Sequence, residues 1–160
     1  MKHLYLVRHA HTLEKLAGQS DKMRDLSALG EQQCHSIGTF LRTKKYPIDL
    51  MLTSDALRAV ATANRIAEYI HYPLENIVQE GELYQSSIPE MLQLLGEYEA
   101  CHHILIVAHN PTLTYFAEYY SGETLREVSP GTLIFLRTSQ PNWRDLTKDS
   151  MHLVETFIPE

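Results

Sequence analysis

Short apolar runs alternate along this chain with segments in which apolar residues recur at helical spacing. The apolar runs predict strands at residues 3–8, 48–52, 77–79, 103–108, 131–137 and 151–158. The helical spacing predicts helices at residues 27–41, 55–70, 87–98 and 111–120. We therefore expect a three-layer α/β/α sandwich with a mostly parallel central sheet of about six strands. The last two strands have no helix between them, which predicts some antiparallel pairing in a mixed sheet.

Polar residues mark where the predicted helices begin. Ser27 and Ser87 each stand at the position of an N-cap, and either Ser54 or Asp55 is expected to cap the helix that follows the second strand. Before the last strand the chain reads as a turn or hairpin, in which Trp143 is expected to extend a strand.

Length and composition fit one soluble globular domain. The chain has 160 residues, of which 44% are hydrophobic and 21% charged, so residues 1–160 are expected to form a single domain. The net charge is −6, and no Lys/Arg-rich stripe is present, which argues against a nucleic-acid surface. An anion-binding site would therefore have to be local, with a few cations gathered in one cleft.

The absence of certain sequence features indicates where the protein is located and which cofactors it uses. No apolar run is long enough to span a membrane, and no leader-like segment precedes the first strand. Cys34 and Cys101 stand in no metal or redox spacing and are expected to be free thiols. These features predict a cytoplasmic protein that holds no metal or other cofactor and has no membrane partner.

The candidate chemistry lies where predicted strands end. Arg8 and His9 close the first strand, and His109 closes the strand at residues 103–108. Arg58 lies one turn into the helix after the second strand. The carboxyl ends of parallel strands meet at one edge of a sheet, where ligands bind. Each residue alone could be a cap or an ion-pair partner. Two guanidinium and two imidazole groups in matching positions instead suggest a phosphoryl-binding site.

Four segments resemble motifs of the histidine phosphatase superfamily. Residues 6–12 resemble its Arg-His-Gly signature, with Ala10 in the glycine place, and residues 106–111 resemble its Val-Gly-His-Asn-Pro segment, with Ala108 for glycine. Residues 53–63 are similar to Ser-x-x-x-Arg-Ala-x-x-Thr-Ala, and residues 21–30 to Arg-x-Leu-Thr-x-x-Gly. Together these matches are specific. The short chain most resembles the compact SixA-type phosphohistidine phosphatases, which implies a phosphoglycerate mutase-like fold.

This resemblance implies a metal-independent phosphatase that works through a covalent phosphohistidine. His9 would attack phosphorus in line, and water would then release phosphate. Arg8, Arg58 and His109 would bind the equatorial oxygens, where negative charge lies in the transition state. The sequence leaves open which nitrogen of His9 attacks.

The general acid is the open point of this mechanism. Glu82 falls where larger members of the superfamily place a catalytic carboxylate, and Asp21 is a second candidate. A site with no acid is the third possibility. An alkoxide leaving group needs a proton, whereas the imidazole of a phosphohistidine leaves more readily. A missing acid would therefore favour hydrolysis of P–N over P–O bonds.

Three functions are compatible with these residues. The first is dephosphorylation of phosphohistidine in a signalling or phosphotransfer protein, because no insertion is available to close the site against a protein. The second is hydrolysis of small phosphate monoesters, such as sugar or nucleotide phosphates. The third is a non-catalytic phosphate- or phosphoprotein-binding module, because Ala10 and Ala108 each add a methyl group near backbone that must approach the phosphate. The oligomeric state is left open.

Overall fold

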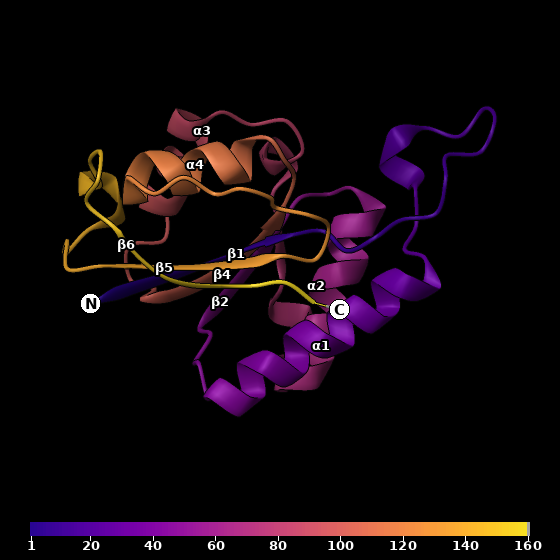
Figure 1. Cartoon of the computed structure of the whole chain (residues 1–160), viewed down its shortest axis with the longest axis horizontal. Helices are drawn as coiled ribbons and strands as arrows, with labels where there is room; N and C mark the ends of the chain where they lie inside the picture. Colours follow the sequence, from indigo (N-terminus) through magenta and orange to yellow (C-terminus); the bar gives the residue numbers. More distant parts are fainter. Residues whose placement is uncertain (160) are drawn as a thin grey trace.

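A single six-stranded sheet organises the computed structural model, which describes residues 1–159 (Figure 1). Glu160, the last residue of the predicted domain, lies outside the described residues. The strands are β1 (Lys2–Arg8), β2 (Leu50–Thr53), β3 (Val78–Gln79), β4 (His103–Ala108), β5 (Leu133–Thr138) and β6 (His152–Phe157). The helices are α1 (Ala28–Lys44), α2 (Leu57–Ile70), α3 (Ile88–Gly96) and α4 (Thr112–Ser121).

The sheet is mixed, as the sequence predicts. Its order is β3-β2-β4-β1-β5-β6, and the first four of these strands pair in parallel. Strand β5 runs antiparallel to β1, and β6 runs antiparallel to β5. Strands β1 and β4 are therefore adjacent at the centre of the sheet. Their carboxyl ends, Arg8 and Ala108, stand at the same register position.

Helices cover both faces of the sheet and complete the three predicted layers (Figure 1). Alternate residues of β1 point to opposite faces, as the pleat of a strand requires. Leu4 and Leu6 pack in a core with residues of α3 and α4, whereas Tyr5 and Val7 pack with residues of α1 and α2. This strand is thus buried on both sides, and only its ends are free to carry polar side chains.

Two of the predicted helix caps are confirmed. The Ser27 hydroxyl accepts the Gly30 N–H at 3.1 Å, which starts α1. Ser87 starts α3 with a reciprocal capping box, in which Glu90 accepts the Ser87 N–H at 3.1 Å and Ser87 accepts the Glu90 N–H at 3.3 Å.

The predicted start of α2 is wrong. Ala56 is its N-cap residue, and no side chain caps it. The Asp55 carboxylate instead lies 3.1 Å from the Lys22 ammonium group. Ser54 is fully buried and contacts a histidine of the site described below. Both predicted cap side chains are therefore engaged in other contacts.

Trp143 does not extend a strand, which corrects a second prediction. It opens a short 3-10 turn, Trp143–Asp145, and its side chain is fully buried. The indole N–H donates to the Cys101 carbonyl at 2.9 Å, and the Trp143 backbone N–H donates to Glu99 at 2.6 Å. A large aromatic side chain with a satisfied N–H gains more from this core position than from an exposed hairpin.

Two further features bear on the sequence predictions. Cys34 is buried, Cys101 is partly buried, and both are free thiols, as predicted. Among residues 1–159, every helix is too short or too polar to cross a lipid bilayer.

Candidate active site

The structure brings together the four residues that the sequence analysis selected. His9 and His109 follow the adjacent strands β1 and β4, and their ring centroids lie 5.2 Å apart. Arg8 is the last residue of β1, and Arg58 lies in the first turn of α2. The His9 N–H donates to the Ala108 carbonyl at 3.1 Å, which ties the two strand ends together.

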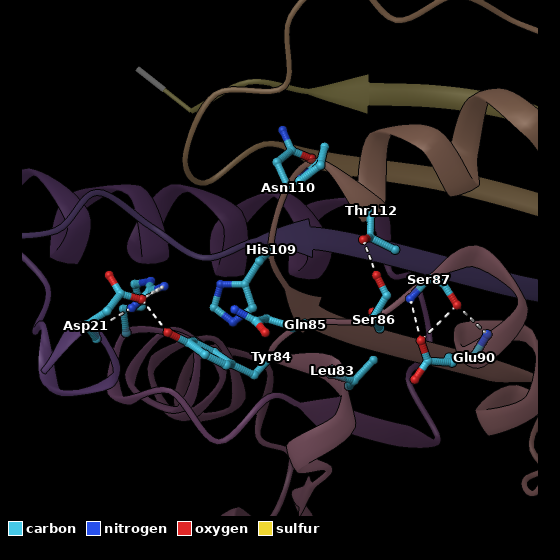
Figure 2. Close-up of a pocket in the computed structure, with 12 residues that line it drawn as sticks. Asp21, Leu83, Tyr84, Gln85, Ser86, Ser87, Glu90, His109, Asn110 and Thr112 are labelled. Atoms are coloured by element: carbon cyan, nitrogen blue, oxygen red, sulfur yellow. Dashed lines mark hydrogen bonds and ion pairs between the residues drawn. The ribbon is translucent and has the colours of Figure 1, made fainter.

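Two hollows meet at these residues. The first, which we call the His9 hollow, has a volume of about 510 Å³, and its lining includes Arg8, His9 and Arg24. The second, which we call the Tyr84 hollow, has a volume of about 550 Å³, and Figure 2 shows residues of its wall. Arg58, His109 and Asn110 line both hollows. These shared residues therefore form the boundary at which an anion would contact both spaces.

His9 is held as a neutral imidazole with a defined tautomer. Its Nδ1 lies 2.9 Å from the Ala10 carbonyl oxygen, which can only accept, so Nδ1 carries the hydrogen. Burial lowers the pKa of His9 to about 4 against the opposing effect of this hydrogen bond, and the nearby charges of Arg58 and Arg8 lower it further. At neutral pH, Nε2 thus keeps an unshared electron pair.

His109 is also neutral, and Ser54 contacts it. The His109 Nε2 lies 2.6 Å from the Ser54 Oγ, and both side chains are buried. Burial lowers the pKa of His109 to about 3, with further contributions from His9 and Arg58. The Ser54 hydroxyl can donate to Nε2, and a neutral ring then carries its single hydrogen on Nδ1. Within residues 1–159 this buried Nδ1 has no hydrogen-bond partner, so it is available as a donor to an anion.

The two arginines are only partly engaged by the protein. Arg8 donates from Nη1 to the Val128 carbonyl at 2.9 Å, and burial beside Arg58 lowers its pKa. Arg58 donates to both the backbone carbonyl and the carboxylate of Asp21, at 2.8 and 2.9 Å. The Nε atoms of both arginines are buried without a partner in the described part of the chain. A guanidinium has five donors, and those left over suit phosphate oxygens.

The two carboxylates considered as general acids lie in different places. Asp21 lines the Tyr84 hollow, and its carboxylate accepts hydrogen bonds from the Tyr84 hydroxyl at 2.5 Å and from Arg58 (Figure 2). The Tyr84 hydrogen bond, with the Arg58 contact, lowers the pKa of Asp21. Glu82 lies in the 3-10 turn Gly81–Leu83, where it is exposed and lines neither hollow.

The two alanines that replace family glycines add no bulk to the hollows. Ala10 packs against Leu26 and Cys34, and Ala108 belongs to the core beneath α3 and α4. Neither alanine lines either hollow. Their methyl groups therefore leave room for a phosphoryl group.

Sequence reasoning missed two polar contacts of the site. Tyr84 carried no signal of its own, because nothing in its neighbourhood indicates that it reaches Asp21, 63 positions earlier. Ser54 stood in a quoted motif, so its proximity to Arg58 could have indicated a role beyond helix capping. In residues 1–159, no group of three or more His, Cys, Asp and Glu side chains is placed to hold a metal ion.

Comparison with known proteins places this geometry in a family. A sequence model of the histidine phosphatase superfamily (branch 1) matches residues 4–83. A 6-phosphofructo-2-kinase/fructose-2,6-bisphosphatase from Aquarana catesbeiana is 21% identical over 78% of this chain, which spans only 34% of that relative's length.

Solved structures share the fold over nearly the whole chain. A protein assigned as phosphohistidine phosphatase SixA from Agrobacterium tumefaciens superposes with a TM-score of 0.85 at 23% identity, covering 99% of this chain and 98% of the other. The protein histidine phosphatase SixA complexed with tungstate gives 0.82 at 19% identity, covering 98% and 97%. With two histidines and two arginines at one sheet edge, and half of its length matched by the family model, this chain belongs to the histidine phosphatase superfamily, branch 1.

Proposed function

We propose that this protein is a metal-independent phosphatase that removes the phosphoryl group from phosphohistidine in a signalling or phosphotransfer protein. The observation that carries the proposal is the protonation state and tautomer of His9. Its Nδ1 donates to a backbone carbonyl, and its depressed pKa leaves Nε2 unprotonated beside two arginines. This is the arrangement of an activated nucleophile.

In the first step, the electron pair of His9 Nε2 forms a bond to phosphorus, and the bond from phosphorus to the leaving group breaks in line. Arg8, Arg58 and the His109 Nδ1–H stabilise the three equatorial oxygens, on which negative charge is spread. The arginines supply the positive charge that a metal ion provides in other phosphoryl-transfer enzymes.

In the second step, water attacks the phosphorylated His9 and phosphate is released. The departing nitrogen is Nε2, and the hydrogen on Nδ1 stays in its bond to the Ala10 carbonyl. The imidazole therefore leaves as a neutral group, and His9 returns to its starting state without a proton transfer of its own.

The carboxylates of the site favour a P–N substrate. Asp21 is held ionised by Tyr84 and Arg58, and Glu82 lies outside both hollows. Glu90 also lines the Tyr84 hollow, but its carboxylate closes the capping box of α3. None of these three groups is arranged to give a proton to an alkoxide, whereas a protonated phosphohistidine needs no such donor.

Small phosphate monoesters are the second candidate substrates. The name of the 6-phosphofructo-2-kinase/fructose-2,6-bisphosphatase relative describes a sugar bisphosphate as its substrate. The structure of a mycobacterial glucosyl-3-phosphoglycerate phosphatase shares the fold with a TM-score of 0.71 at 15% identity. The Tyr84 hollow, at about 550 Å³, also has room for a small organic group.

A direct assay decides between turnover and binding alone. The protein is incubated with a phosphotransfer protein phosphorylated on histidine, and free phosphate is measured over time, with a sugar phosphate in parallel. We expect the phosphoprotein to lose its phosphoryl group faster with wild type than with the His9→Ala variant. Equal phosphate release by wild type and His9→Ala would defeat the proposal, and release only from the sugar phosphate would favour the second candidate.

A further inference from the structure

The carboxylate of Asp21 stands on the side of the site that an in-line reaction assigns to the leaving group. His9 lines one hollow and Asp21 lines the other, and Arg58 and His109 form the boundary between them. A phosphoryl group bound by Arg58 and His109 at this boundary would be attacked by His9 from the side of the His9 hollow. In-line displacement then sends the leaving group into the Tyr84 hollow.

The spacing of this carboxylate matches an imidazole ring. Asp21 Oδ2 lies 2.9 Å from Arg58 Nη2, and a phosphate oxygen bound by the same guanidinium would lie about 3 Å away on its other side. The carboxylate is therefore about two hydrogen bonds from the phosphoryl group. In a phosphorylated imidazole, the ring separates the phosphoryl group from the far nitrogen, and that nitrogen donates a hydrogen bond of about 3 Å. The distance from the phosphoryl group to the acceptor of this hydrogen bond is similar.

Tyr84 fixes the carboxylate in this place. Its hydroxyl donates to Asp21 Oδ2 at 2.5 Å, and its ring meets the His109 ring edge-on at 5.5 Å between centroids (Figure 2). The Lys22 ammonium group lies 4.7 Å from the centroid of the Tyr84 ring. The tyrosine is thus packed between the site and the loop that carries Asp21, and it can hold the carboxylate as an acceptor.

We propose that Asp21, positioned by Tyr84, accepts a hydrogen bond from the far ring N–H of the substrate's phosphorylated imidazole and so selects P–N over P–O substrates. This inference rests on the proposed function, because it concerns the leaving group of the same reaction. Asp21 is then a specificity residue that contacts substrate, and Tyr84 is a positioning residue that acts through it.

The electron and proton balance of the step needs no further reactant. The substrate ring carries the phosphoryl group on one nitrogen and a hydrogen on the other, and it is cationic. When His9 Nε2 forms its bond to phosphorus, the pair of the breaking P–N bond returns to the ring. The ring leaves as neutral imidazole, and its remaining N–H stays with the Asp21 carboxylate throughout.

The same carboxylate discourages ester substrates. A phosphate monoester develops negative charge on its leaving oxygen, and an ionised Asp21 beside that oxygen repels it. A cationic ring is attracted instead, and the hydrogen bond keeps it protonated to higher pH. The discrimination thus depends on charge as well as on shape.

Two small substrates test this inference without the influence of protein docking. Free phosphohistidine and 4-nitrophenyl phosphate are compared with wild type, Asp21→Asn and Tyr84→Phe across pH 6 to 9. The matched control is Asp25→Asn, which removes a carboxylate from the same loop at a residue that lines neither hollow. Nitrophenolate leaves without protonation, so this ester reports how the Asp21 charge acts on an anionic leaving oxygen.

We expect Asp21→Asn to lower kcat/KM for phosphohistidine about tenfold at pH 8, the size of one charged hydrogen bond, and to lower it less at pH 6. Its kcat for phosphohistidine should decline at a lower pH than that of wild type. Tyr84→Phe should show the same pattern to a smaller degree. Asp21→Asn should raise the rate with 4-nitrophenyl phosphate, because the charge that repels its leaving oxygen is removed, and Asp25→Asn should match wild type with both substrates.

Equal losses on both substrates at every pH would overturn the inference, because they would mean that Asp21 only orders Arg58. An unchanged phosphohistidine rate in Asp21→Asn would overturn it as well, as would an identical effect of Asp25→Asn. These outcomes differ from failure of the proposed function, in which wild type itself would hydrolyse phosphohistidine no faster than His9→Ala.

Discussion

Replacing Ser54 with alanine tests how the second histidine of the site is held. The Ser54 Oγ lies 2.6 Å from His109 Nε2, in a place where both side chains are buried. Alanine removes the hydroxyl and leaves Nε2 without its donor. The depressed pKa keeps His109 neutral with a single hydrogen, and without the Ser54 donor that hydrogen is no longer confined to Nδ1. A share of the molecules then presents an electron pair of Nδ1 to the phosphoryl oxygens.

The size of the loss follows from the strength of that hydrogen bond. A lost oxyanion donor costs about 3–4 kcal/mol of transition-state stabilisation. The tautomer preference imposed by Ser54 is limited to the value of one buried hydrogen bond, about 1–3 kcal/mol. The smaller figure sets the effect, so kcat/KM should fall about 5- to 150-fold, with kcat affected as well. Ser54→Thr keeps a hydroxyl and should retain most of the activity.

The assay combines kinetics with a spectroscopic measurement. Steady-state rates with 4-nitrophenyl phosphate give kcat/KM, and nitrogen-15 NMR of the histidine rings reports which nitrogen of His109 carries the hydrogen. We expect Nδ1–H in wild type and Ser54→Thr, and a larger share of Nε2–H in Ser54→Ala. If Ser54→Ala kept its rate within about twofold, or lost rate while His109 stayed Nδ1-protonated, the reasoning would be refuted.

Four further predictions concern pH, the excluded carboxylate and the packing behind the site. The acid limb of kcat/KM should fall near pH 4, because the pKa of His9 is lowered to about 4; a limb near pH 6.5 would contradict this. The same lowered pKa values of His9 and His109 mean that the native state binds fewer protons than the unfolded chain. The free energy of unfolding in urea should therefore decrease as pH falls from 6.5 towards 4, by up to roughly 1.4 kcal/mol per pH unit for each histidine, and a flat profile would count against it. Glu82→Gln should leave hydrolysis of a sugar phosphate within about twofold of wild type, because Glu82 lies outside both hollows; a large loss would restore it as the acid. Gly30→Ala should lower the melting temperature by several degrees, since its methyl carbon would lie 2.2 Å from the His11 carbonyl oxygen, whereas Gly96→Ala, with its nearest contact at 3.7 Å, should not; equal melting temperatures would show that the loop yields freely.

The sheet and the four central residues could be predicted because their signals are local. Arg8 and His9 interrupt an apolar run at its end, and His109 repeats the pattern. In a parallel sheet such ends meet at one edge, so the topology itself gathers them. The Ser87 cap could be predicted for the same reason, because a capping box involves residues only three positions apart.

Contacts between distant segments could not be predicted in this way. Ser54 reads as a helix cap by propensity, but a buried imidazole 55 positions away takes its hydroxyl. Trp143 reads as a strand residue, but the carbonyl of Cys101 offers its indole a buried partner. The Tyr84–Asp21 contact depends on how the first loop folds back over α2. In each instance tertiary packing decides between local options that the sequence leaves nearly equal.

Formation of a phosphoryl bond on His9 is the most direct test of this mechanism. Wild type and His9→Ala are mixed with phosphohistidine, quenched in alkali within milliseconds to seconds, and analysed by mass spectrometry of their peptides. The mechanism predicts a transient phosphoryl group on His9 that appears and decays at rates compatible with turnover. Turnover without any label on His9, or turnover that persists in His9→Ala, would contradict it.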